Sequence, residues 1–240
     1  MATRERGLED GCLAVTFERK YYHRGGAFIK RNLRPREYRI GYRGLHIPRL
    51  GKERLINEAE ALRYIRQNTD IPVPEVYCDF EDDQAYYVIT EYIEGEDMAS
   101  LSVEQKAIVA RELSVHLAKL QTLRSNRMGG PSGIVIPPYR VMRRTAIDYW
   151  RLQVSNSVDE YVFCHNDLSQ HNVIVDPDTL KIKAIIDWEY AGFYPAYFEM
   201  PFYTRPGPSI AIDGEVDDSE RLLDFLMSKT DRAAWMSPGW

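Results

Sequence analysis

The sequence lacks any long apolar run. Its longest apolar-rich stretch, residues 85–93, contains Thr90 and Glu91 and is far shorter than the roughly 20 residues that a membrane-spanning helix needs. Residues 1–6 lead into no apolar segment, so we expect no secretory leader and no membrane partner.

Cysteine is scarce. Cys12, Cys78 and Cys164 are odd in number, lie far apart and form no C-x-x-C pair. This pattern excludes a disulfide framework and offers no zinc-finger spacing. We therefore expect reduced thiols and a cytoplasmic protein.

No G-x-G-x-x-G motif, fixed-period repeat or nucleic-acid motif is present, so we expect no nucleic-acid partner. The net charge of −5 is unevenly spread, because residues 1–66 carry twice as many basic as acidic residues and the remainder is acidic. A basic part facing a polyphosphate and an acidic part facing a cationic acceptor would give this split. Two solvated surfaces of opposite sign are the alternative.

Polar residues are concentrated in residues 163–176 and 185–189. His165, Asp167 and Asn172 follow the pattern His-x-Asp-x4-Asn, and a second carboxylate, Asp187, comes after them. Phosphoryl-transfer sites need this set of groups: one Asp takes the proton of the acceptor, while an Asn and another Asp hold magnesium ions.

Residues 172–187 are predicted to form a β-hairpin, since two apolar runs flank the turn at residues 176–179. An antiparallel hairpin brings its open ends together, so Asn172 and Asp187 can reach one magnesium ion. Asp167, on the preceding loop, can then face an acceptor hydroxyl. We expect His165 to brace this loop without transferring a proton.

The first part of the chain contains strand candidates at residues 13–17 and 27–30, separated by a turn at residues 24–26. Lys30 ends the second strand. Residues 54–65 carry a helical apolar stripe, and Glu58 lies on it. A carboxylate facing a core needs a partner, for which Lys30 is the natural candidate. A solvated Lys30 and a partly exposed Glu58 are the alternative.

Residues 76–80 and 85–90 are predicted to form a hairpin that leaves through residues 91–95, where the backbone of Glu91 and Ile93 can meet an adenine edge. Residues 103–123 are predicted to be a helix with a capping box at Ser102, residues 124–138 a loop, and residues 146–154 a short helix. We expect an α+β fold with a small strand-rich N-lobe (1–94) and a mainly helical C-lobe (95–240).

These motifs resemble the aminoglycoside phosphotransferase and choline kinase group of small-molecule kinases, which have the protein-kinase-like fold. The similarity rests on residues 165–172 and 186–189, extends to 27–30, 57–60, 71–74 and 90–95, and covers roughly residues 13–205. It implies ATP and Mg²⁺ as cofactors and a small-molecule acceptor, for which the charge distribution makes a cation one candidate. The implied roles are a phosphate contact for Lys30, its orientation by Glu58, adenine contacts at Glu91 and Ile93, a base at Asp167, and magnesium ligands at Asn172 and Asp187.

Other interpretations stay open. A kinase-fold binding or scaffold protein without turnover would explain the missing glycine motif. A metal-dependent hydrolase would use His165, Asp167, His171 and Asp187 as ligands, and Cys164 with His165 would form a weaker nucleophile pair. The acidic run 213–220 is a candidate for attracting a cationic acceptor. The aromatic residues at 188–194 either line an acceptor pocket or pack in the core.

Overall fold

The computed structural model describes residues 9–150 and 160–230. Its small lobe is built on a five-stranded antiparallel sheet with the order β1-β2-β3-β7-β6. The strands are β1 (Cys12–Val15), β2 (Arg19–Arg24), β3 (Ala27–Asn32), β6 (Val76–Asp82) and β7 (Ala85–Glu91). A small hairpin of β4 (Arg39–Gly41) and β5 (Gly44–His46) follows β3.

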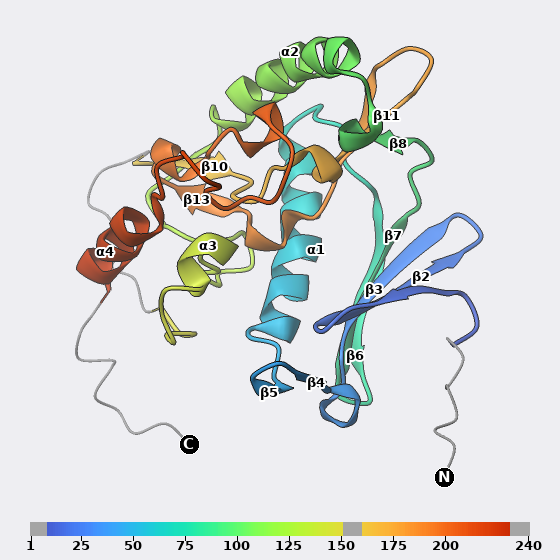
Figure 1. The fold of residues 1–240 in the computed structure, drawn as a ribbon, viewed down its shortest axis with the longest axis vertical. Coiled ribbons are helices and arrows are strands. Elements are labelled where there is room, and N and C mark those ends of the chain that lie inside the picture. The colour runs from blue at the N-terminus through green and yellow to red at the C-terminus, as the bar shows by residue number, and fades with distance from the viewer. Residues whose placement is uncertain (1–8, 151–159, 231–240) are drawn as a thin grey trace.

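Helix α1 (Gly51–Asn68) stands between this sheet and the large lobe (Figure 1). Leu55 and Ala59 pack against Val88 of β7, while the next turns of the helix join the core of the large lobe. The helix ends where the Thr69 hydroxyl caps the Ile65 carbonyl, after which prolines force extended chain. The structure confirms the predicted helix and lengthens it at both ends.

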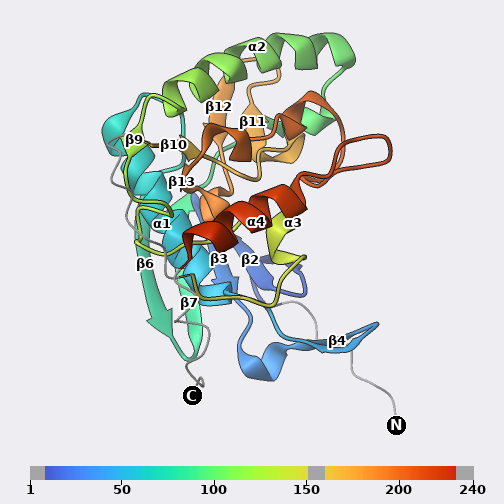
Figure 2. The same ribbon diagram turned by 90° about the vertical axis from the view of Figure 1, so that its left-hand side faces the viewer.

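The large lobe combines α2 (Val103–Leu120), α3 (Tyr139–Met142) and α4 (Ser219–Lys229) with short strands. One three-stranded sheet contains β9 (Arg124–Ser125), β10 (Tyr161–Cys164) and β13 (Gly192–Tyr194). The other contains β8 (Glu96–Asp97), β11 (Val173–Val175) and β12 (Ile182–Ile185). Figure 2 shows α2 covering the end of this lobe that lies away from β4. The two-lobe α+β architecture predicted from the sequence is confirmed.

Two predictions of local structure were wrong. Strand β2 was missed because its sequence, Arg-Lys-Tyr-Tyr-His-Arg, has no alternation of apolar and polar residues. The short helix expected at residues 146–154 is not found at 146–150, which are irregular, and the rest of that range lies outside the described residues. Within the described residues, no helix is long and apolar enough to cross a bilayer.

Candidate active site

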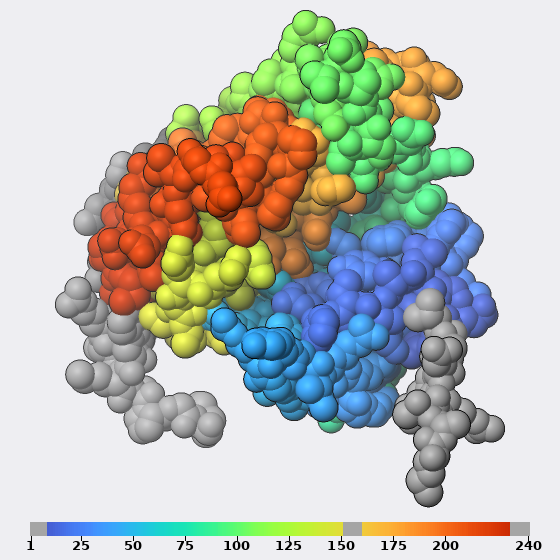
Figure 3. All heavy atoms as spheres, in the orientation of Figure 1, coloured from blue at the N-terminus to red at the C-terminus, as the bar shows by residue number. Residues whose placement is uncertain are grey.

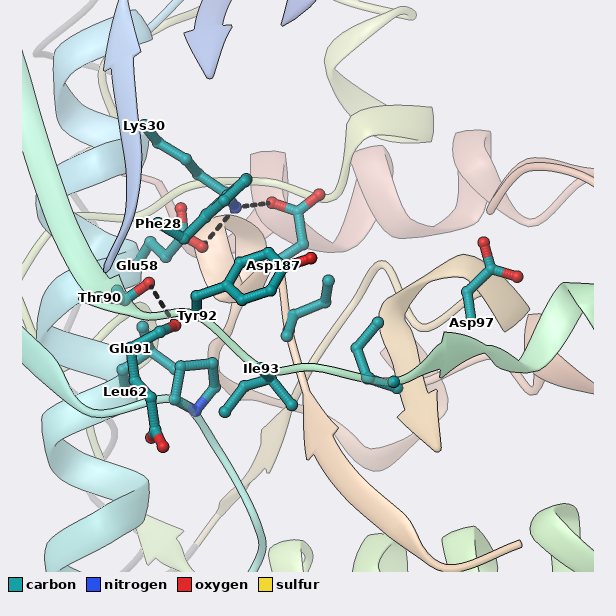
Figure 4. A pocket seen from close by; sticks show the side chains of 14 residues that line it. Phe28, Lys30, Glu58, Leu62, Thr90, Glu91, Tyr92, Ile93, Asp97 and Asp187 are labelled. Carbon is teal, nitrogen blue, oxygen red and sulfur yellow. Dashed lines mark hydrogen bonds and ion pairs between the residues drawn. The ribbon is translucent and has the colours of Figure 1, made fainter. Parts of the chain in front are cut away.

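Lys30 joins two carboxylates that come from different lobes. Its Nζ lies 2.6 Å from Glu58 Oε1 on α1 and 2.9 Å from Asp187 Oδ1 beyond β12 (Figure 4). The side chains of Lys30 and Glu58 are largely buried, whereas that of Asp187 is 35% exposed. The structure therefore brings together three residues that sequence reasoning singled out.

The charges in this cluster are coupled. Burial raises the pKa of Glu58 to about 7, and the nearby carboxylates of Asp187 and Glu189 add to this effect against the attraction of Lys30. Burial also works against ionised Asp187, but Lys30 outweighs it and holds the pKa of Asp187 below its usual range. Asp187 and Glu58 together keep Lys30 charged, and they raise its pKa despite burial.

Asp187 leaves the predicted hairpin in the left-handed backbone region, with φ of 66°. The backbone N–H of Ile186 donates to the Asn172 carbonyl at 3.0 Å, so the hairpin places Asn172 and Asp187 at its open end. Asn172 Nδ2 donates to the Asp167 carbonyl at 2.7 Å. This bond fixes the amide plane and connects the hairpin to the loop of Asp167.

His165 braces the same loop. It is fully buried, its Nδ1 accepts from the Asp167 backbone N–H at 3.2 Å, and its Nε2 lies 3.0 Å from the Ile186 carbonyl. Since Nδ1 accepts, Nε2 carries the proton and donates. Burial lowers the pKa of His165 to about 4, so the imidazole is neutral near pH 7. These contacts fit the supporting part that we expected from the sequence.

Asp167 opens into a cavity of about 290 Å³ between the lobes. Asn172, Ser169 and Ser209 line it from the large lobe, and Glu18 and Arg54 line it from the small lobe. Burial raises the pKa of Asp167 to about 8, and the charge of Asp187 contributes to this shift. The cavity therefore holds a carboxylate with unusual proton affinity.

A second cavity, of about 310 Å³, is lined by Lys30, Glu58 and Asp187. Phe28 forms part of its wall, the segment 90–95 lines it, and Ile186 and Asp187 close it (Figure 4). Among the described residues, none accepts a hydrogen bond from the Ile93 backbone N–H. That donor is free for a ligand, as an adenine contact requires.

The turn that joins β1 to β2 is closed on itself. Thr16 Oγ1 accepts from the backbone N–H groups of Glu18 at 3.2 Å and Arg19 at 2.9 Å. These N–H groups are thus unavailable to an anion, whereas glycine-rich loops offer theirs to phosphates.

An ionic network that sequence reasoning missed bridges the lobes. Arg19 of β2 donates to Glu189, and Arg54 of α1 pairs with Glu18 and lies 3.5 Å from Glu189. Both arginines are buried. In the sequence, Arg54 lies one helical turn before Glu58. This spacing places the two residues on the same side of the helix, but it does not identify Glu18 or Glu189 as the partners of Arg54.

The hydrolase interpretation is contradicted by the two imidazoles. Both ring nitrogens of His165 are already engaged, and His171 is exposed, 3.3 Å from Asp97. The Cys164 nucleophile is likewise wrong, because this thiol is fully buried and burial raises its pKa. Cys164 belongs to the core.

The acidic run 213–220 is largely occupied. Asp217 pairs with Arg144, Glu215 pairs with Arg205, and buried Asp218 receives two bonds from Arg140. The expectation that this run attracts a cationic acceptor is therefore not supported. The aromatic residues Trp188, Tyr190, Phe193 and Tyr194 are buried, and Tyr190 also lines the cavity at Asp167.

The donor set fits a magnesium ion. Carboxylate oxygens of Glu58, Asp187 and Glu189 lie within 4.8 Å of one another, and Glu58 Oε2 is buried without a hydrogen-bond partner among the residues that the structure describes. Hard oxygen donors of this kind suit Mg²⁺. Glu189 is held by arginines, so Asp187 is the carboxylate best placed to bind an ion.

Comparisons with known proteins agree on one family. The profile of the phosphotransferase enzyme family matches residues 6–203. Ethanolamine kinase 2 from Mus musculus is 24% identical over 146 residues, which are 52% of this chain and 36% of the kinase. Probable choline kinase 3 from Arabidopsis thaliana is 42% identical over 48 residues, which are 20% of this chain and 14% of that protein. The matches thus span about a third or less of these relatives.

Among solved structures, aminoglycoside phosphotransferase APH(3'')-Id from Streptomyces rimosus superposes with a TM-score of 0.54 and 16% identity. The superposition covers 92% of this chain and 84% of that one. At this identity the likeness establishes the shared fold.

Proposed function

Because this chain belongs to the phosphotransferase enzyme family, we propose that it transfers the γ-phosphoryl group of ATP to a hydroxyl of a small molecule. The observation that carries the proposal is the Lys30 bridge between Glu58 and Asp187. Phosphoryl transfer depends on positioning and charge neutralisation, and this bridge fixes a cation beside Asp187, the proposed metal ligand, in the wall of the cavity of about 310 Å³.

The nucleotide is assigned to the cavity lined by residues 90–95. The backbone of Glu91 and Ile93 would hold the adenine edge, and Lys30, oriented by Glu58, would contact the phosphates. The closed β1–β2 turn provides no backbone donors from Glu18 and Arg19, so side chains and cation bear most of the phosphate charge.

Asn172 and Asp187 would hold Mg²⁺, which neutralises phosphate charge when it is bound. Asn172 Nδ2 is committed to the Asp167 carbonyl, which leaves its Oδ1 to act as the ligand. Asp187 keeps a low pKa beside Lys30, so it stays ionised as a metal ligand must.

Asp167 would accept the proton of the attacking hydroxyl. Its pKa of about 8 makes it a stronger base than an ordinary carboxylate, and a base works best near the operating pH. His165 holds the Asp167 backbone and the Ile186 carbonyl at once, which keeps base and metal ligand in register.

The cavity at Asp167, about 290 Å³, suits a small acceptor. Relatives named as ethanolamine and choline kinases make a cationic amino alcohol the first class to test. The carboxylates of Glu18 and Glu189 are already paired with arginines, so neutral polyols form the second class.

The test is ADP release by the purified chain with Mg-ATP and a panel of amino alcohols, polyols and aminoglycosides. An acceptor that stimulates ADP release supports the proposal, provided that Asp167→Asn lowers this release by about a hundredfold or more while its Tm stays near that of the wild type. Equal turnover in Asp167→Asn would refute the assignment of the base.

A binding or scaffold protein is the second candidate, favoured by the closed β1–β2 turn. A thermal-shift titration separates the two, since a kinase is stabilised by millimolar Mg-ATP and a scaffold without a nucleotide site is not.

We also propose a lobe boundary near residues 94–95. The free thiols of Cys12, Cys78 and Cys164 support a cytoplasmic location.

A further inference from the structure

Asn57 connects three segments that meet beside the site. It is fully buried, and its Nδ2 donates to the carbonyls of Glu189 at 3.2 Å and Ala191 at 2.8 Å. Its Oδ1 accepts from the Ser132 hydroxyl at 2.7 Å. Turning the amide over would set Oδ1 against two carbonyl oxygens, so these contacts fix its orientation.

The packing at this junction leaves no slack. A Cβ atom on Gly130 would lie 1.7 Å from Asn57 Oδ1, and one on Gly192 would lie 2.6 Å from the Gly129 carbonyl oxygen. Gly129 and Phe193 exchange two backbone hydrogen bonds. Helix α1 is therefore closely packed at the point where the segment of Gly129 and Gly130 is hydrogen-bonded to the segment of Gly192 and Phe193.

This junction lies next to the reactive cluster along the chain. Glu58 directly follows Asn57, and the two carbonyls that Asn57 bonds come two and four residues after Asp187. A rotation of α1 about its axis would move Glu58 away from Lys30, and the amide bonds of Asn57 oppose that rotation. Arg54, one turn earlier, adds a contact with Tyr190.

We infer that Asn57 is a positioning residue: it fixes α1 against the segment after Asp187, and so holds Glu58 and Asp187 on the same ammonium group of Lys30. The inference rests on the proposed nucleotide site. According to this inference, Asn57 affects nucleotide binding because it positions Glu58, and this effect is separate from any effect of Asn57 on folding.

The experiment measures the Kd of Mg–AMP-PNP by isothermal titration for the wild type, Asn57→Asp, Glu58→Gln and the double variant. Asn57→Asp keeps the shape of the side chain but removes both donors. Ile65→Val serves as the control, because Ile65 is a buried residue of the same helix and its truncation lowers Tm without touching the junction.

We expect Asn57→Asp to weaken binding about tenfold, Ile65→Val to leave the Kd unchanged, and the double variant to bind within about twofold of Glu58→Gln. Such non-additivity marks two residues that act through one contact. Losses that multiply in the double variant, or a wild-type Kd in folded Asn57→Asp, would overturn the inference.

Two further outcomes are informative. If Asn57→Asp does not fold, Ser132→Ala is used instead; it removes the hydroxyl that donates to Asn57 Oδ1 and that also accepts from the Ile134 backbone N–H at 3.2 Å. Weaker binding of Mg–AMP-PNP by Ser132→Ala, with no further weakening when the change is added to Glu58→Gln, supports the inference. An unchanged Kd overturns it. If the wild type itself binds no Mg–AMP-PNP, the proposed function fails and this inference fails with it.

Discussion

Acidification should weaken the fold through His165. This imidazole is fully buried and neutral, with Nδ1 accepting from the Asp167 N–H and Nε2 donating to the Ile186 carbonyl. A second proton would cancel the acceptor at Nδ1 and place a charge in the core. The perturbation is a fall in pH from 8 to 4, compared between the wild type and His165→Gln.

The magnitude follows from the pKa of His165, which burial lowers from 6.5 to about 4. Between pH 6.5 and pH 4, this histidine is protonated in the unfolded chain but neutral in the folded chain. The contribution of His165 to the free energy of unfolding is therefore fully present above pH 6.5 and is lost as pH falls. The loss from this group is about 2 kcal/mol at pH 5 and about 3 kcal/mol at pH 4. For a domain stable by about 5–15 kcal/mol, that loss is large.

The assay is urea unfolding at a series of pH values, with the free energy of unfolding of His165→Gln subtracted from that of the wild type. We expect a difference that shrinks by about 2 kcal/mol between pH 7 and pH 5. His171→Gln is the matched control for replacement of a histidine, since the His171 side chain is 64% exposed and lies at the surface beside Asp97. A constant difference across the pH range for His165→Gln would refute the reasoning.

Three further outcomes are expected. Lys30→Met leaves buried Glu58 and partly exposed Asp187 without a cation, so the free energy of unfolding should fall by about 3 kcal/mol in urea; an unchanged value would show that the bridge is not stabilising. Arg140→Met strands buried Asp218 and should cost about 3–5 kcal/mol, most of which Arg140→Met/Asp218→Leu restores in the same assay. Asp187→Asn should abolish the strengthening of AMP-PNP binding by Mg²⁺ in a calorimetric titration, and persistence of that effect would exclude Asp187 as a ligand.

The lysine–glutamate pair was predictable because two local sequence patterns each required a partner of opposite charge. Lys30 ends an apolar strand, and Glu58 lies on the apolar stripe of a helix, where an unpaired carboxylate would be costly. The hairpin that brings Asn172 to Asp187 was also readable from its turn residues.

The interlobe network was not predictable, because its reason lies in tertiary contacts. Nothing in the local sequence marks Arg19 or Arg54 as buried arginines, yet both are buried against Glu189. Asn57 likewise resembles any polar helix residue until its backbone partners are known. Burial of a polar group depends on which distant chain segment satisfies it, and a local pattern does not contain that information.

Asp187 has a left-handed backbone conformation, as does Asn166 with φ of 69°. This conformation affects which substitutions would accumulate in variants of this protein. Glycine adopts this conformation without the penalty of about 1 kcal/mol that other residues meet, and Asp187→Gly would also remove a half-buried charge. A library selected for expression or heat resistance alone could accumulate such changes, since stability and activity can be opposed at such positions. A high yield of folded protein would then be a poor indicator of an intact active site. Screens of such variants should therefore measure nucleotide binding instead of yield.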